Sequence, residues 1–213
     1  MSGFREESEE RLVHRLEAFS DIVIAFSLAQ MTLSLTLTAD PLQLFTTGYV
    51  TLVGFGLTFL VVCGMWWAHH RLFTHFFYPT TVNIILNFLS LAGVLLLVYA
   101  LQLWLHATVH KWVAYTMYTG AVAWVLGLNA ILTYRGIALR GEHLPAELAE
   151  RGKHRAIGQG IMAVAFALST AWDVRTQTFG RAESTLILAL LALGFGAARF
   201  IQRRRSSATR SAV

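Results

Sequence analysis

The chain has 213 residues, of which 55% are hydrophobic and only 14% are charged. Soluble globular proteins carry roughly 25% charged residues, so this composition excludes an ordinary soluble domain and indicates a polytopic membrane protein. The net charge of +5 does not indicate nucleic-acid binding, because the basic residues flank apolar segments as membrane topology requires. Cys63 is the single cysteine, which excludes a disulfide within the chain and a cysteine zinc site.

Six apolar segments follow one another along the chain, and most are long enough to cross a bilayer core of about 30 Å. They are residues 18–38, 45–69, 81–105, 112–134, 156–173 and 184–202. A charged segment, 1–17, precedes them, and a basic tail, 203–213, follows them. The sequence therefore predicts an all-α integral membrane protein with one domain of six transmembrane helices over 18–202.

The basic residues predict the orientation of these spans. Fourteen of the 17 Lys and Arg residues lie on the side that holds both termini and the 135–155 loop. The positive-inside rule places that side, with the 1–17 segment and the tail, in the cytoplasm. The 135–155 loop is expected to contain a short helix over 144–151, because Pro145 is suited to a first helical turn.

Residues 19–37 of the first span carry more polar groups than an anchor needs, namely Asp21, Gln30 and five hydroxyl residues. Polar groups in hydrocarbon usually face other protein or water. On a helix that turns 100° per residue, a stripe about 60° wide contains Phe26, Gln30, Leu33 and Leu37. Ser27 flanks this stripe, and Asp21 lies about 140° away from it. The stripe either packs against a helix of the same chain or lines a narrow pore formed by several copies.

Asp21 has two candidate environments of its own. It could pair with Arg15 near the cytoplasmic interface, or it could join a buried polar network. Candidate partners close the second span, in the run Trp66-Trp67-Ala68-His69-His70-Arg71, and Asn87 lies in the third span. Such a network would hold the first helix in place.

No residue pattern predicts catalysis. No Ser–His–Asp set, phosphate-binding loop or pair of carboxylates stands out, so we expect neither an enzyme nor a cofactor. His70 and His75 are five residues apart, which is the wrong spacing for a metal pair on one helical face. His106 and His110 are four apart around an outer loop and form only a minor metal alternative. We expect no metal site.

A set of residues in the first three spans is distinctive. Arg15-x-x-x-Phe19-Ser20-Asp21 opens the first span, Trp67-x-His69-His70-Arg71 closes the second, and Asn87 lies in the third. This set resembles the prokaryotic, six-span members of the transmembrane protein 175 family of potassium channels, over residues 15–90. The resemblance implies a homotetramer in a prokaryotic cell membrane, with the first helices lining a central pore. It also implies a network behind the pore helix formed by Arg15, Phe19, Ser20, Asp21, Trp67, His69, His70, Arg71 and Asn87.

The resemblance further implies where the pore is narrow. In that family, large apolar residues constrict the pore five, nine and twelve positions after the motif Asp, which here are Phe26, Gln30 and Leu33. Phe26 is then the main constriction, with Leu33 and Leu37 beyond it. Ala29 occupies a position that usually holds a Thr linked to selectivity. Gln30, supported by Ser27, is expected to form a polar ring that partly replaces ion hydration.

The sequence therefore predicts a passive potassium channel subunit whose partners are K⁺, copies of itself and the lipid bilayer. Proton permeation is an added expectation, because some relatives also pass protons. The alternative is a proton-coupled transporter in which Asp21 and the His69/His70 cluster relay protons. A membrane enzyme or a non-conducting assembly factor is a further alternative.

Overall fold

The computed structural model describes residues 2–33, 48–106 and 110–177. Its elements are α1 (Ser2–Leu33), α3 (Tyr49–His75), α4 (Thr81–His106), α5 (Lys111–Arg140), the 3₁₀ turn η1 (Gly141–His143) and α6 (Ala146–Thr176). No strand occurs in these ranges. The predicted all-α architecture is therefore confirmed for the part of the chain that is described.

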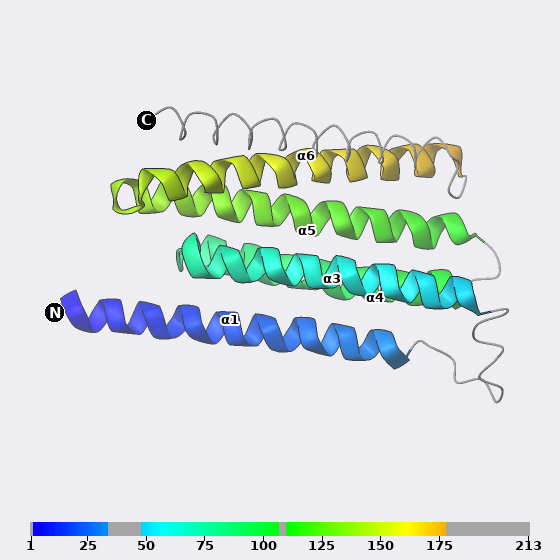
Figure 1. Ribbon diagram of the computed structural model, residues 1–213, viewed down its shortest axis with the longest axis horizontal. Helices are drawn as coiled ribbons and strands as arrows, with labels where there is room; N and C mark the ends of the chain where they lie inside the picture. The colour runs from blue at the N-terminus through cyan, green and yellow to red at the C-terminus, as the bar shows by residue number, and fades with distance from the viewer. Residues whose placement is uncertain (1, 34–47, 107–109, 178–213) are drawn as a thin grey trace, which may run out of the picture.

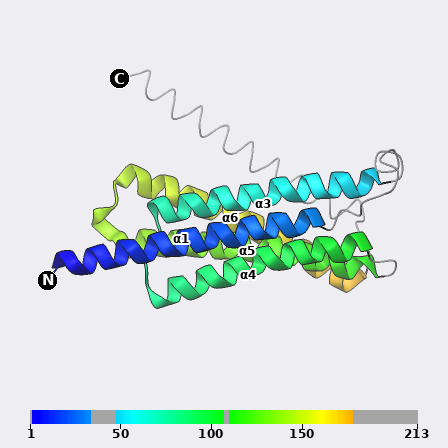
Figure 2. The same ribbon diagram turned by 90° about the horizontal axis from the view of Figure 1, so that it is seen from below.

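The helices lie side by side as long rods (Figure 1). In Figure 1, α1 and α6 lie at opposite edges with α3, α4 and α5 between them. The view in Figure 2 shows the N-terminal end of α1 projecting beyond the neighbouring helices. The most extensive packing joins α5 to α6 and α4 to α5, whereas α1 contacts α3 and α4. All five α-helices are long and apolar enough to cross a membrane. The predicted sixth span, 184–202, lies outside the described residues.

Two predicted boundaries differ from those of the structure. The helix of the first span begins at Ser2, so most of the charged 1–17 segment is helical. The prediction of a separate short helix over 144–151 is wrong, because α6 begins at Ala146 and runs without interruption into the membrane segment. Ion pairs between Glu147 and Arg151 and between Glu150 and Lys153 extend the helix into charged sequence, since such pairs lie on one helical face.

The core consists of two clusters. The larger surrounds α4 and joins Leu97 to residues of α1, α3 and α5, such as Met31, Val62 and Val125. The smaller lies at the other end of α3 and centres on Phe76 and Phe77. The second cluster ties the end of α3 to α1, α5 and α6.

Phe76 is packed closely by two glycines. A Cβ atom on Gly136 of α5 would overlap the carbonyl oxygen of Phe76. A Cβ on Gly152 of α6 would lie 2.7 Å from the Phe76 ring. Glycine is therefore required at Gly136 because of the close approach of another backbone, as in other membrane helix contacts.

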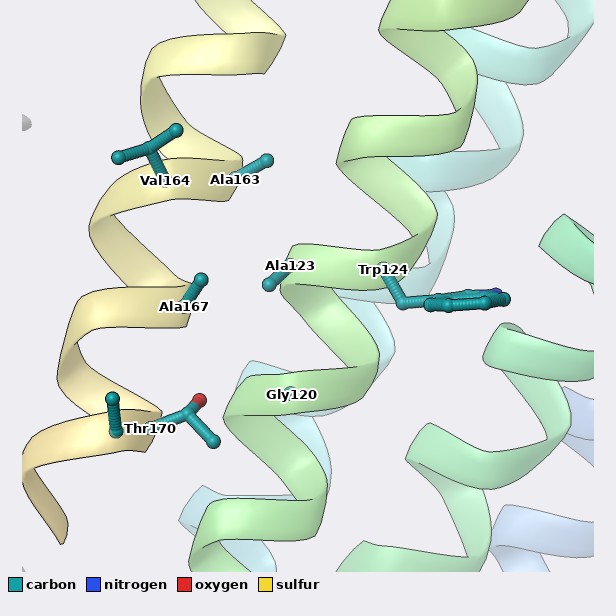
Figure 3. A pocket seen from close by; sticks show the side chains of 8 residues that line it. Gly120, Ala123, Trp124, Ala163, Val164, Ala167 and Thr170 are labelled. Atoms are coloured by element: carbon teal, nitrogen blue, oxygen red, sulfur yellow. The ribbon is translucent and has the colours of Figure 1, made fainter. Parts of the chain in front are cut away.

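Small residues also line the contact between α5 and α6. Gly120, Ala123, Ala163 and Ala167 border an apolar groove between the two helices, as Figure 3 shows. Trp124 points away from α6 in this view, and its indole nitrogen donates a hydrogen bond to the backbone oxygen of Leu89 on α4. The same stretch of α5 thus uses small side chains toward α6 and a large one toward α4.

Candidate functional site

Helix α1 has two faces of opposite character. One face is buried against α3 and α4 and contains Leu16, Ser20, Ile24, Ser27 and Met31. These residues recur at three- and four-residue spacing, which places them on one side of the helix. The rotation of α1 about its axis is therefore defined by this buried stripe.

The opposite face of α1 is exposed in the single chain. It presents Phe19, Ile22, Phe26, Ala29 and Leu33. Phe26 is 57% exposed and Leu33 is 77% exposed, so most of the surface of these two apolar side chains is uncovered in the single subunit. This surface needs lipid or another subunit to cover it.

Gln30 lies at the edge of this exposed face and is half-buried. Its backbone oxygen accepts a hydrogen bond of 3.2 Å from the Gln102 side chain of α4. Leu37, the last residue of the predicted stripe, lies outside the described residues. Ser27 is 1% exposed, and its hydroxyl donates to the backbone oxygen of Val23. Ser27 therefore faces the interior of the subunit and does not flank the exposed stripe as expected.

A buried chain of hydrogen bonds connects α1, α3 and α4. The Nε2 atom of His69 donates to Asn87 Oδ1 at 2.7 Å, and Asn87 Nδ2 donates to Ser20 Oγ at 3.3 Å. The Ser20 hydroxyl in turn donates to the backbone oxygen of Leu16 at 2.7 Å. All three side chains are almost fully buried, so losing one member would leave buried polar atoms unsatisfied.

A second set of contacts joins α1 to α3 at the edge of this chain. The indole nitrogen of Trp66 donates to Asp21 Oδ1 at 2.9 Å. One turn away, Nδ1 of His70 donates to Glu17 Oε1 at 3.1 Å. The Trp66 and His70 rings stack on each other with centroids 5.9 Å apart. Two acids on α1 therefore meet two rings on α3.

Some members of the predicted network lie outside it. Arg15 is exposed and, among residues the structure describes, makes no ion pair with Asp21 or another acid. Trp67 is 53% exposed, and the Arg71 guanidinium lies over its ring at 5.8 Å. Phe19 contacts Phe88 of α4 edge-to-face at 5.9 Å. Trp67 lies outside the network because Trp66, the preceding residue of the helix, is the tryptophan that faces α1.

Glu17 was not predicted as a site residue, and Trp66 was named only within the run of candidate partners for Asp21. A signal for both was present in the sequence. Glu17 and Asp21 are four residues apart, as are Trp66 and His70, so each pair occupies one helical face. Matching these two pairs across the first two spans would have placed them together.

The site has the chemistry of a structural joint. One indole, one amide and one hydroxyl group join two imidazoles and two carboxylates, and their side-chain hydrogen bonds run between helices. Within the described ranges, no group of three His, Cys, Asp or Glu residues could hold a metal ion. His106, one of the weakly considered metal ligands, hydrogen-bonds through Nδ1 with the backbone oxygen of Gln102 at 2.8 Å.

Comparisons with known proteins found one family model and similar solved structures. A family model described as the endosomal/lysosomal potassium channel TMEM175 matches residues 15–97. The fold is similar to a crystal structure of the potassium channel MtTMEM175, a T38A variant bound to a nanobody fusion. That match has a TM-score of 0.66 and 18% identity, over 91% of this chain and 93% of that one. No curated protein matches the sequence.

A second similar structure is a lysosomal potassium-selective channel TMEM175 homolog from Chamaesiphon minutus. It has a TM-score of 0.60 and 24% identity, over 88% of this chain and 98% of that chain. The chain therefore has an all-helical fold that is similar to those of these two channel structures. The family model covers the region of the first three predicted spans, so the resemblance to the TMEM175 family is confirmed for residues 15–97. That family is one of ion channels and not an enzymatic class.

Proposed function

We propose that this protein is a potassium channel subunit that conducts K⁺ passively through a pore lined by α1. The observation that carries the proposal is the pair of faces on α1. Its buried face is fixed by hydrogen bonds to α3 and α4, while its opposite face offers unpartnered apolar residues. Several copies around an axis would bury that face and form a narrow apolar passage.

The assembly that fits this arrangement is a homotetramer of six-span subunits with both termini in the cytoplasm. The family relationship and the distribution of basic residues support it. A prokaryotic plasma membrane is the location that fits the two similar structures. Lipid would cover the outer surface of the tetramer, and protons could share the passage with K⁺.

Phe26 is the main constriction in this proposal, with Leu33 as a second apolar ring and Leu37 beyond it. Apolar constrictions restrict conduction by dewetting, and Phe26 and Leu33 both project from the exposed face. Ala29 lies between them on that face. Gln30 contributes an amide from the edge of the stripe. We do not include Ser27 in the pore lining, because its side chain is buried.

The decisive experiment measures ion currents of the purified protein in planar bilayers. With K⁺ and Na⁺ on opposite sides, wild type should show a reversal potential that favours K⁺. Phe26→Ala should raise the K⁺ conductance severalfold, because a smaller side chain at the constriction admits more water. Phe59→Ala on α3 removes a similarly exposed ring and should leave the conductance unchanged. Absence of current in both wild type and Phe26→Ala would contradict the channel function.

Gln30 offers a separate test of the pore lining. Gln30→Leu should change the K⁺/Na⁺ permeability ratio, because the amide would no longer contact the ions. Gln102→Leu is the matched control, since Gln102 contacts the Gln30 backbone from α4 without reaching the exposed face. An equal change of the ratio in both variants would contradict a pore position for Gln30.

The transporter alternative predicts different behaviour. Flux would saturate with substrate, would be coupled to a proton gradient and would be abolished by Asp21→Asn. In the structure, Asp21 accepts a hydrogen bond from an indole nitrogen, which is a donor only and cannot accept a proton from the carboxyl group. This contact favours a structural role for Asp21.

A further inference from the structure

The exposed side of α1 follows a seven-residue repeat. One series consists of large apolar side chains, each at least 40% exposed, at Leu12, Phe19, Phe26 and Leu33. A second exposed series lies three residues further along, at Arg15, Ile22 and Ala29. Positions that alternate by three and four residues are the a and d positions of a heptad, through which parallel helices pack as a coiled coil.

This repeat begins outside the apolar part of the helix. Between residues 7 and 17 the helix carries six charged side chains, at Glu7, Glu9, Glu10, Arg11, Arg15 and Glu17. Such a segment does not lie in hydrocarbon, so acyl chains do not cover Leu12. The N-terminal end of α1 also projects beyond the neighbouring helices in Figure 2. A single exposed leucine needs no explanation, but this one continues the register of the three residues that follow it.

The repeat also predicts how neighbouring copies of α1 would cross. On a helix with 3.6 residues per turn, each heptad falls about 20° short of two full turns. The series therefore drifts by about 60° between Leu12 and Leu33. Helices that keep such a series directed at one axis wind around each other with a left-handed supercoil.

We propose that the α1 helices of four subunits form a parallel, left-handed coiled coil that continues past the membrane to Leu12. This rests on the tetramer of the proposed function and extends its interface into the cytoplasm. From Leu12 to Phe26 the helix rises about 21 Å, so a ring of four Leu12 side chains lies about that far from the main constriction.

Arg15 gives this extension a particular character. It occupies a d position between Leu12 and Phe19, and a charged residue in such a seam fixes the register and the number of helices at a cost in stability. Four guanidinium groups around one axis repel one another and hold water. The cytoplasmic mouth is therefore a hydrated layer at Arg15 below an apolar layer at Phe19.

Lipid is the competing cover for the part of this face that lies in the membrane. Acyl chains suit Phe26 and Leu33 as well as another helix does. They require no heptad spacing, however, and they do not reach the charged segment that contains Leu12. A second copy of α1 covers both parts with one register.

The experiment is cross-linking of single-cysteine variants of the full chain in membranes with a short bifunctional maleimide. Cys63→Ala removes the natural cysteine and is the background. Leu12→Cys should give linked pairs of subunits. His14→Cys is the matched control, because its position is also exposed and lies about 160° around the helix. It should link at least about ten-fold more slowly, since its side chain is on the outside of the coil. Equal rates, or no linking at Leu12→Cys, would overturn the proposal.

A charge at position 12 provides a test without cysteine. Leu12→Glu brings four carboxylates together, so the dissociation constant of the detergent-solubilised oligomer should rise at least about ten-fold. His14→Glu should leave it unchanged. Thermal unfolding of the subunit should not change in either variant, because both side chains are exposed. Unaltered association in Leu12→Glu would overturn the coil.

Ion currents separate this proposal from the channel function. K⁺ current without linking at Leu12→Cys would keep the pore lined by α1 and overturn its cytoplasmic extension. Linking at Leu12→Cys, absent at His14→Cys, in a protein that passes no current would support the coiled coil and contradict the channel function.

Discussion

The helices of the bundle are joined by one kind of contact in one half and by another kind in the other half. Where α1 meets α3 and α4, directional hydrogen bonds among Ser20, Asn87 and His69 join the helices. Where α5 meets α6 and the end of α3, glycines such as Gly136 and Gly152 allow backbones and rings to approach closely. The hydrogen bonds join particular atoms of neighbouring helices, whereas the glycines determine how closely the backbones approach. A helix whose exposed face must point in one direction benefits from the first kind of contact.

The largest expected effect tests the close-packed half. Gly136→Ala would place a Cβ against the Phe76 carbonyl oxygen, which no side-chain rotation relieves. We expect a loss of at least about 3 kcal/mol of stability, measured as thermal unfolding in detergent. Gly152→Ala should cost less, because the ring of Phe76 can move. Gly160→Ala is the control, since a Cβ there meets nothing within 4 Å. Equal effects at all three sites would show that these contacts do not control packing.

The next effect tests the hydrogen-bonded half. Asn87→Ala would leave both His69 Nε2 and Ser20 Oγ without their interhelical partner. The expected loss is about 2 kcal/mol, measured by thermal unfolding. The same variant should also change single-channel conductance, because α1 loses the contact that sets its rotation. A destabilised variant with unaltered conductance would show that this contact stabilises the fold but does not determine the geometry of the pore.

Two serines on the buried face of α1 make a smaller and sharper comparison. Ser20→Ala removes an acceptor used by Asn87, so about 1 kcal/mol should be lost. Ser27→Ala removes a hydroxyl that bonds only to its own helix, and stability should change by less than about 0.5 kcal/mol. A double-mutant cycle of Ser20→Ala with Asn87→Ala should show coupling, whereas Ser27→Ala with Asn87→Ala should not.

The smallest expected effect concerns Asp21. In Asp21→Asn, the amide oxygen can still accept the hydrogen bond from Trp66, so stability and K⁺ conductance should stay near those of wild type. Trp66→Phe should have a larger effect, because it removes the donor. Trp67→Phe, at the exposed neighbouring position, is the control for Trp66→Phe. Loss of all flux in Asp21→Asn would instead favour the proton-coupled transporter.

Much of the fold follows from hydropathy alone. The first five predicted spans each correspond to a helix, and the all-α class is as expected. The ends of the helices were less predictable, as α6 shows. Charged residues from Glu147 to Arg155 resemble a loop in hydropathy, yet they are good helix formers with intrahelical ion pairs. Hydropathy therefore predicts which residues lie in the membrane, but not the residue at which a helix begins or ends.

The rotation of each helix was harder to predict than its position. Helix α3 is apolar on most sides, so its sequence does not indicate whether Trp66 or Trp67 faces α1. On α1, the separation of Asp21 from Phe26 and Leu33 agrees with the predicted periodicity. The placement of Ser27 does not, because a hydroxyl that bonds to its own backbone can lie on an apolar buried face. A helical projection of the sequence does not show such hydrogen bonds between a side chain and its own helix.

The position of Phe76 has a consequence for how the protein can be divided. The family model matches residues 15–97, so the matched part of the chain includes most of α1, the whole of α3 and most of α4. Phe76 belongs to that part, yet Gly136 and Gly152 of the unmatched part enclose it. A truncation after α4 would therefore leave an aromatic pair, Phe76 and Phe77, open to solvent. We therefore expect a fragment that ends after α4 to be less stable than the full chain.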